Sequence, residues 1–108
     1  MVEAEYRVDV ERAGEFVLAM RQLGRLRRRD GAMRWALFRD PAEPGRYIES
    51  FVVESWAEHL RQVERATLAD RELDALARSF LMDAEYPTLT HLVAAQAPDH
   101  TGPIVDGV

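Results

Sequence analysis

The chain of 108 residues contains no cysteine and no lysine. Without cysteine it can form no disulfide, and it has neither a thiol nucleophile nor a thiolate ligand for zinc or an iron–sulfur cluster. Without lysine it cannot form a Schiff base with a carbonyl substrate, nor can it supply the lysine of a phosphate-binding P-loop. Arginine and three histidines are therefore its only basic side chains.

Several sequence signals for membranes, cofactors and nucleic acid are also missing. No apolar run approaches the roughly 20 residues of a membrane span, and the first residues lack the pattern of a signal peptide, so we expect a cytoplasmic protein without a membrane span. The net charge of −5 disfavours nucleic acid as a partner. The arginines at 25–29 end a predicted helix, where cations interact favourably with the helix dipole. His59, His91 and His100 lack metal-ligand spacing, and there is no glycine-rich dinucleotide fingerprint, so we expect no metal and no cofactor.

The first third of the chain predicts a strand and a helix within a single domain, since this length accommodates one core. Apolar and polar residues alternate from Val2 to Asp9, which is the period of a strand. Apolar residues then recur at helical spacing from Phe16 to Leu26. This pattern predicts a long amphipathic helix that Asp9 caps and Gly31 ends.

The middle of the chain predicts a β-hairpin, because "AMRWALFRD" and "RYIESFVVE" flank the turn-forming segment "PAEPG". If "PAEP" is a four-residue loop, Ala36 lies opposite Glu49 and Arg34 lies opposite Phe51. The two charged residues are then diagonal neighbours on one face of the sheet, beside Tyr47.

The last third predicts a second helical region and a short strand. Ser55 and Glu58 fit a capping box at its start, and a second cap signal at Thr67 predicts that the helical region 56–81 is broken there. "TLTHLVA" follows as the last strand. From residue 95 the composition turns to Pro, Gly and Asp, so we expect a folded domain over 1–94 and a flexible or partner-crossing tail over 95–108.

The element order β-α-β-β-α-β predicts an α+β protein of the ferredoxin-like type, in which two helices cover one face of a four-stranded antiparallel sheet. The other face must meet water or a partner. The hairpin strands carry apolar residues on both faces, with Met33 and Trp35 on one side and Ala36 and Phe38 on the other. We therefore expect a homodimer formed through the sheet faces.

The segments "YRVDVERAGEFVLAMRQLGRLRRRDGAMRW", "FVVESWAEHLRQVERATLADREL" and "PTLTHL" resemble the dimeric α+β barrel domains grouped with antibiotic biosynthesis monooxygenases. They are most similar to the soluble C-terminal domain of major-facilitator transmembrane secretion effectors, over residues 2–94. Relatives of this fold include cofactor-free oxygenases of aromatic polyketides, haem-degrading enzymes, cyclases and domains without known chemistry. Haem-oxidising relatives use an asparagine on the first strand, where this chain has Glu3, Glu5 or Arg7.

His59 and Trp56 are candidate site residues at the start of the second helical region. His59 flanks the apolar stripe of that helix, and a side chain with a pKa of about 6.5 is suited to proton transfer, although half-buried histidines are also common in ordinary helices. Trp56 is expected to be substantially buried, closing the core or contacting a substrate.

Arg34, Glu49 and His91 are further candidates. An Arg34–Glu49 pair could be a salt bridge within the sheet or across the dimer, or it could orient a polar ligand. His91 shares a strand face with Leu89 and Val93, so it is either a buried histidine satisfied by a neighbour or a ligand contact.

These residues support two functional hypotheses. The first is a small-molecule tailoring enzyme of secondary metabolism, a cofactor-independent monooxygenase or cyclase acting on an aromatic or polyketide-like substrate. Trp35 and Tyr47 would form its walls, Arg34 would polarise an oxygen and His59 would move a proton. The second is a noncatalytic ligand-sensing or assembly domain, like the soluble part of a major-facilitator exporter. The two differ in whether His59 and Arg34 converge on one cavity.

Overall fold

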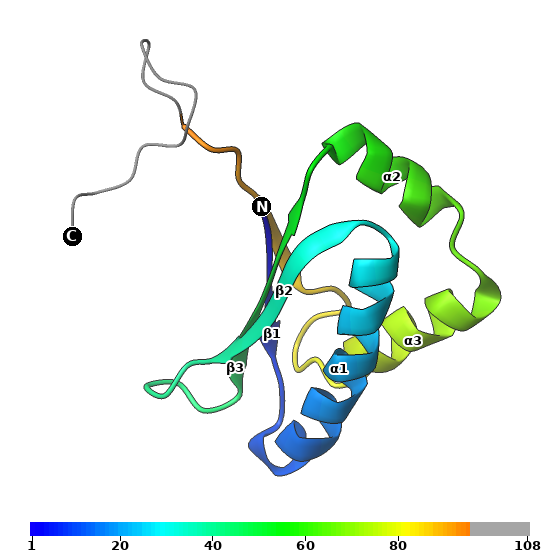
Figure 1. Ribbon diagram of the computed structural model, residues 1–108. Helices are drawn as coiled ribbons and strands as arrows, with labels where there is room; N and C mark the ends of the chain where they lie inside the picture. Colours follow the sequence, from blue (N-terminus) through cyan, green and yellow to red (C-terminus); the bar gives the residue numbers. More distant parts are fainter. Residues whose placement is uncertain (96–108) are drawn as a thin grey trace.

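The computed structural model describes residues 1–95, and in this part the chain forms one four-stranded sheet and three α-helices (Figure 1). The elements in chain order are β1 (Val2–Arg7), the 3-10 turn η1 (Val10–Arg12), α1 (Ala13–Arg29), β2 (Ala32–Arg39), β3 (Arg46–Val53), α2 (Trp56–Glu64), α3 (Leu68–Arg78) and β4 (Thr88–His91). The predicted tail over 95–108 lies outside the described residues, apart from Ala95.

The sheet is antiparallel with the strand order β2-β3-β1-β4, so β2 and β4 are its edges. All three helices lie on one side of this sheet (Figure 1). The strand order and the one-sided helical layer confirm the predicted ferredoxin-like α+β fold. The face that the helices leave uncovered is called the outer face below.

The first strand and helix follow the sequence pattern with small shifts at their ends. Side chains of β1 alternate between buried and partly exposed, as the two-residue period predicts. The strand ends at Arg7, and Asp9 accepts the amide N–H of Glu11, so Asp9 caps η1 and α1 begins after that turn. Gly31 follows α1 with φ +103°, a left-handed conformation that strains other residues.

The helical region after β3 is broken at Thr67, as predicted. Thr67 and Asp70 form a complete capping box at the start of α3. Ser55 caps α2 by accepting the amide N–H of Glu58 at 3.3 Å. The predicted reciprocal half of that box is wrong, because the Glu58 carboxylate binds Arg61 at 2.6 Å instead.

Aromatic side chains form the centre of the core between α1 and the sheet. Phe16 of α1 is fully buried, and its ring centroid lies 5.3 Å from Tyr6 and 5.1 Å from Tyr47. Phe80 packs on Phe16 at 5.8 Å. Full burial of a large apolar side chain contributes about 1.5–3 kcal/mol to folding. These contacts fix α1 across β1 and β3.

The loop of the β2–β3 hairpin is one residue longer than predicted. Arg39 pairs with Tyr47, and the Asp40 N–H bonds to the Arg46 carbonyl at 3.0 Å, so residues 41–45 form the loop. Gly45 belongs to it because its φ of +87° is left-handed and does not continue a strand.

This longer loop makes the predicted hairpin register wrong by one residue. Glu49 lies opposite Leu37 and Arg34 lies opposite Val52. Because side chains alternate along a strand, a shift of one residue moves a side chain to the other face. Glu49 therefore faces the helices and Arg34 lies on the outer face, so the predicted diagonal pair does not form.

Candidate functional site

A carboxylate lies at the buried centre of the sheet, on the side of the helices. Glu49 of β3 has no exposed surface and accepts hydrogen bonds from the Tyr6 hydroxyl at 3.1 Å, Arg27 Nε at 3.1 Å and Trp35 Nε1 at 2.8 Å. A buried carboxylate needs such donors because it has lost its water. The cluster ties α1 to three strands.

The charges of this cluster are fixed by its own geometry. Burial opposes the charge on Arg27, but the adjacent Glu49 carboxylate outweighs it and raises the pKa of the guanidinium. Burial, and then the charge of Glu49, raise the pKa of the Tyr6 hydroxyl far above its usual value. Arg27 thus stays charged and Tyr6 stays a neutral donor, so the cluster has a structural role.

Trp35 connects the buried cluster with the protein surface. Its indole N–H binds Glu49, and its ring lies against Gly24 of α1, where an added Cβ would sit 2.7 Å from an indole carbon. Only glycine allows α1 to approach the ring this closely. The indole is therefore held from two sides, and it also lines a groove.

A groove of about 590 Å³ lies between α1 and the β2 edge of the sheet. It has an apolar and aromatic floor and two arginines, and it is lined by Ala13, Gly14, Val17, Leu18, Arg21, Trp35, Leu37, Arg39 and Tyr47. A smaller hollow of about 230 Å³ beside the 41–45 loop shares Ala13, Arg39 and Tyr47 with it. Small-molecule sites have volumes of about 300–1,000 Å³, so this α1–β2 groove is large enough for a ligand of several rings.

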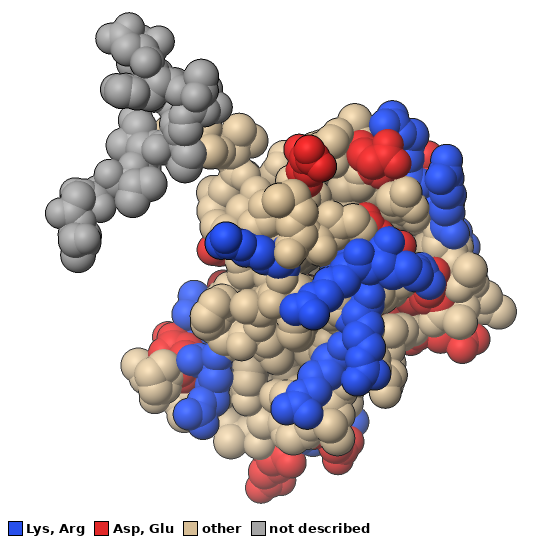
Figure 2. Space-filling model, viewed as in Figure 1, with Lys and Arg blue, Asp and Glu red and all other residues tan. Residues whose placement is uncertain are grey.

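Arginine side chains gather along α1, the helix that forms one wall of this groove. Figure 2 shows arginine side chains over α1, while acidic side chains lie mainly towards the edges of the view. The exposed arginines of α1 are Arg21, Arg25, Arg28 and Arg29. Since the whole chain has a net charge of −5, this concentration of positive charge is a local feature.

The groove contains two of the residues predicted to contact a substrate. Trp35 and Tyr47 both line it, and Tyr47 also belongs to the core, with 6% of its surface exposed. Glu49, a third predicted residue, is not among the lining residues. It instead accepts a hydrogen bond from the Trp35 indole N–H, and Trp35 lines the groove.

Arg34 lies on the outer face, away from this groove. It borders a shallow hollow of about 440 Å³ together with Met33, Phe38 and Val52. Within residues 1–95 no carboxylate forms an ion pair with it. The predicted partner, Glu49, is bound to Arg27 on the opposite side of the sheet.

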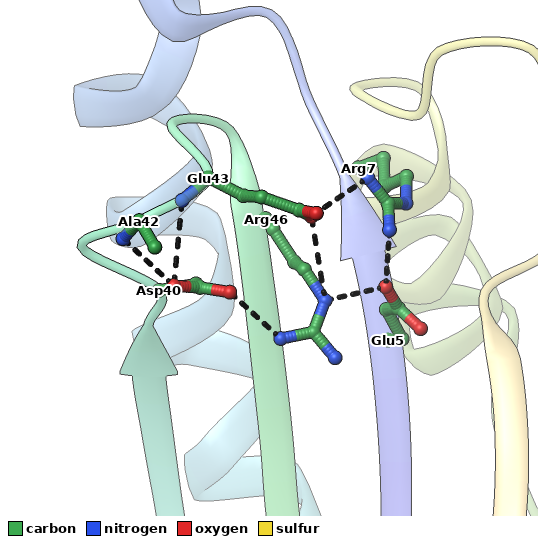
Figure 3. Close-up of polar contacts among 6 residues, drawn as sticks. All are labelled: Glu5, Arg7, Asp40, Ala42, Glu43 and Arg46. Carbon is green, nitrogen blue, oxygen red and sulfur yellow. Dashed lines mark hydrogen bonds and ion pairs between the residues drawn. The ribbon is translucent and has the colours of Figure 1, made fainter.

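A charged network occupies the other end of the outer face, beside the hairpin loop (Figure 3). Arg46 donates to Glu5 at 2.7 Å and to Asp40 at 3.0 Å, and Arg7 donates to Glu43 at 3.1 Å. These contacts hold the hairpin loop against β1. They also fix the end of β2 that borders the groove.

His59, Trp56 and His91 form a second cluster, where α2 meets the edge strand β4. The Trp56 ring stacks on His91 at 4.0 Å and lies 5.3 Å from His59. Trp56 is 38% exposed whereas His59 is 7% exposed. The predicted burial of Trp56 is wrong because the indole packs on an edge strand, and His91 is likewise exposed.

His59 is a buried histidine at the margin of a small hollow of about 180 Å³. Its Nδ1 has no hydrogen-bond partner within residues 1–95. Burial lowers the pKa of His59, Arg27 and His91 lower it further, and Asp30 partly opposes them. His59 and Arg34 border separate hollows, so the structure does not bring them together within one chain.

The sequence patterns do not identify Arg21, Arg27 and Arg39 as site residues. For Arg27 a signal exists, since Met20, Leu23 and Arg27 recur at helical spacing and place the arginine on the buried side of α1. Arg21 and Arg39 carry no such signal, because their common position depends on how α1 lies beside β2.

Among residues 1–95, no group of three His, Cys, Asp or Glu side chains is placed to hold a metal ion. In the same part of the chain, none of the helices has the length and apolar character needed to cross a bilayer.

Comparisons with known proteins identify a family and a fold. A family model described as transmembrane secretion effector matches residues 1–99. No curated protein matches the chain. An antibiotic biosynthesis monooxygenase structure is similar with a TM-score of 0.71 and 19% identity, covering 88% of this chain and 97% of that one.

Two further structures have the same fold. A monooxygenase-like protein of Caulobacter crescentus has a TM-score of 0.73 at 21% identity, covering 88% of each chain. SnoaB, a cofactor-independent oxygenase of Streptomyces nogalater, has a TM-score of 0.67 at 15% identity, covering 92% of this chain and 95% of its own. Identities this low establish a shared fold and leave the activity open.

Proposed function

This chain belongs to the family of transmembrane secretion effectors, and from that premise we propose that residues 1–94 form a domain that binds a small aromatic or polyketide-like molecule in the α1–β2 groove. The domain acts on this molecule in the cytoplasm, as a cofactor-independent oxygenase or cyclase of secondary metabolism. SnoaB, which shares the fold, is a cofactor-independent oxygenase, and this supports the same class of chemistry here.

The observation that carries the proposal is the aromatic wall of the groove. Trp35 and Tyr47 both line the groove, Tyr47 with the 6% of its surface that is exposed, and aromatic side chains favour a planar ligand. Trp35 is held by Glu49 and by close packing on Gly24 before any ligand arrives. A side chain that is already ordered loses little conformational freedom on binding, which favours affinity.

The roles of the other candidate residues stay predictions. His59 is predicted to move a proton, Arg34 to polarise an oxygen, and Trp56 and His91 to contact a ligand, but none of the four lines the α1–β2 groove. Because Arg34 and His59 lie on opposite sides of the sheet, they cannot reach one ligand within a single chain.

A homodimer through the outer faces is the partner arrangement that we propose. Phe38 on β2 is 57% exposed and lies opposite Ile48 on β3, while Met33, which is 65% exposed, borders the hollow of the outer face together with Val52. Pairing of two such sheets buries about 1,500 Å² or more in total and leaves the groove on the helical side accessible. Light scattering should give twice the chain mass, and a monomer at micromolar concentration rejects the dimer.

A noncatalytic ligand-sensing or assembly domain is the second candidate. The specific observation in its favour is that no histidine or carboxylate of residues 1–95 lines the groove. Proton transfer to a ligand bound in the groove would then need a titratable group that does not line the groove.

Blocking the groove tests the proposal. An added Cβ at Gly14 meets no atom within 4 Å, so Gly14→Leu places a side chain in the groove without displacing the core. Gln22→Leu adds the same side chain at an exposed position of α1 outside the groove and serves as the control. The ligands are a panel of neutral hydroxylated naphthalenes and anthracenes, with binding, oxygen uptake and product formation measured.

Binding and turnover that Gly14→Leu removes and Gln22→Leu retains support the enzyme. Binding without turnover, with the same dependence on Gly14, supports the second candidate. If none of the panel binds, the groove is not a site for neutral aromatic molecules, and if Gly14→Leu binds as well as the original chain, the groove is not the ligand site.

A further inference from the structure

Two arginines stand at the rim of the α1–β2 groove. Arg21 comes from the middle of α1 and Arg39 from the last position of β2, so they belong to its two opposite walls. Among residues 1–95, the other lining residues carry no charge. The groove therefore holds two positive charges in a chain whose net charge is −5.

Neither of these charges is neutralised by the described part of the protein. Within residues 1–95 no carboxylate lies within 4.0 Å of Arg21 or Arg39. Asp40, which follows Arg39 in the chain, is occupied by Arg46, which also binds Glu5. Both groove guanidinium groups are thus available to an anion from solution.

The β2 wall gives the groove a direction. Trp35, Leu37 and Arg39 are alternate residues of one strand and share the face that is turned towards α1. At about 3.3 Å per residue, the distance from Arg39 to Trp35 along the strand is about 13 Å. Tyr47 lies directly opposite Arg39 on β3. Arg39 and Tyr47 therefore lie at one end of the β2 wall and Trp35 lies at the other end, about the length of two or three fused rings away, with Leu37 between them.

We propose that the groove binds an aromatic carboxylic acid, with the carboxylate between Arg21 and Arg39 and the rings lying over Leu37 towards Trp35. This inference rests on the proposed ligand site and adds the charge and the orientation of the ligand. A guanidinium group binds a carboxylate through parallel N–H···O bonds, and the rings remove the apolar floor from water. A neutral ring system meets only the floor, and a short acid meets only the arginines.

Isothermal titration with 2-naphthoic acid, its methyl ester and acetate tests this inference. The acid should bind the original chain at least about tenfold more tightly than either other compound. A hydrogen bond between charged groups raises affinity by about this factor relative to a neutral hydrogen bond. Arg21→Gln and Arg39→Gln should each weaken the acid about tenfold and leave the ester unchanged. Arg25→Gln is the matched control, since Arg25 is exposed on α1 but does not line the groove.

Three results overturn the inference. Equal affinity for acid and ester, with both lost in Gly14→Leu, leaves the groove as a ligand site but removes its preference for an acid. An acid preference that survives both glutamine variants, or falls equally in Arg25→Gln, reflects general attraction to a basic surface. If neither naphthalene compound binds, the inference is rejected. The neutral panel and the Gly14→Leu variant still test the proposed function separately.

Discussion

The indole Nε1 of Trp35 donates a hydrogen bond to Glu49 Oε2 at 2.8 Å, and the same oxygen accepts the Nε–H of Arg27 at 3.1 Å. A buried ion pair therefore sets the orientation of the groove wall. Gly24 presses on the ring from α1. Changes in the core should consequently alter the groove, although Glu49 itself does not line it.

Removing the Glu49 carboxylate should cost much of the stability of the domain. Glu49→Ala leaves the Arg27 guanidinium, with 21% of its side chain exposed, without its counter-charge, and it leaves the Trp35 N–H unbonded. Loss of one partner of a buried ion pair typically costs about 3–5 kcal/mol. Urea denaturation of this variant measures the loss.

Glu54→Ala is the control for this change, because Glu54 is exposed beyond the end of β3. Its effect should stay within about 0.5 kcal/mol. Equal losses in the two variants would show that the buried ion pair does not contribute specifically.

Two glycines of the same helix should respond in opposite directions to alanine. A Cβ at Gly24 would lie 2.7 Å from the Trp35 ring, so Gly24→Ala should destabilise the fold by about 1–3 kcal/mol through overpacking. A Cβ at Gly14 meets nothing within 4 Å, so Gly14→Ala should stabilise α1 by about 0.5–1 kcal/mol. Thermal melts of both variants check the pair, and stabilisation by both would mean that Trp35 does not pack on Gly24.

Sequence patterns predict some of these features and not others. The hydrophobic period of β1 and α1 and the cap at Thr67 are local signals, so they predict the order of elements and the break between α2 and α3. The hairpin register is different, because it depends on the left-handed conformation of Gly45. One additional loop residue moved Arg34 to the outer face and left Arg27 as the partner of Glu49.

The candidate site was predicted in part for the same reason. Trp35 and Tyr47 are recognisable as aromatic residues of the hairpin, and both line the groove. The relative burial of Trp56 and His59 depends on where α2 meets β4, and helical periodicity does not specify that contact. The position of Arg21 and Arg39 on opposite walls of one groove likewise depends on tertiary packing.

The stability of the fold should decrease as the pH falls below about 6.5. Burial disfavours the charged form of folded His59 and lowers its pKa, Arg27 and His91 lower it further, and Asp30 partly opposes them. The unfolded chain, in which histidine has a pKa of about 6.5, binds the proton first. The contribution of neutral His59 is therefore complete above pH 6.5 and is lost progressively as the pH falls to the lower folded pKa, with a slope of at most about 1.4 kcal/mol per pH unit.

His59→Leu tests this assignment by removing the titrating group and the unpaired Nδ1. Urea denaturation of the variant between about pH 5 and 7 should show a flatter dependence than that of the original chain. Identical slopes would assign the pH dependence to other groups.

The measurement that tests the central claim most directly is chemical-shift mapping of the isotopically labelled chain during titration with 2-naphthoic acid. The amide signals of Gly14, Arg21 and Arg39 should shift most, because these residues line the α1–β2 groove. Largest shifts at His59 and His91 would place the ligand between α2 and β4 and would contradict the assignment of the groove as the binding site.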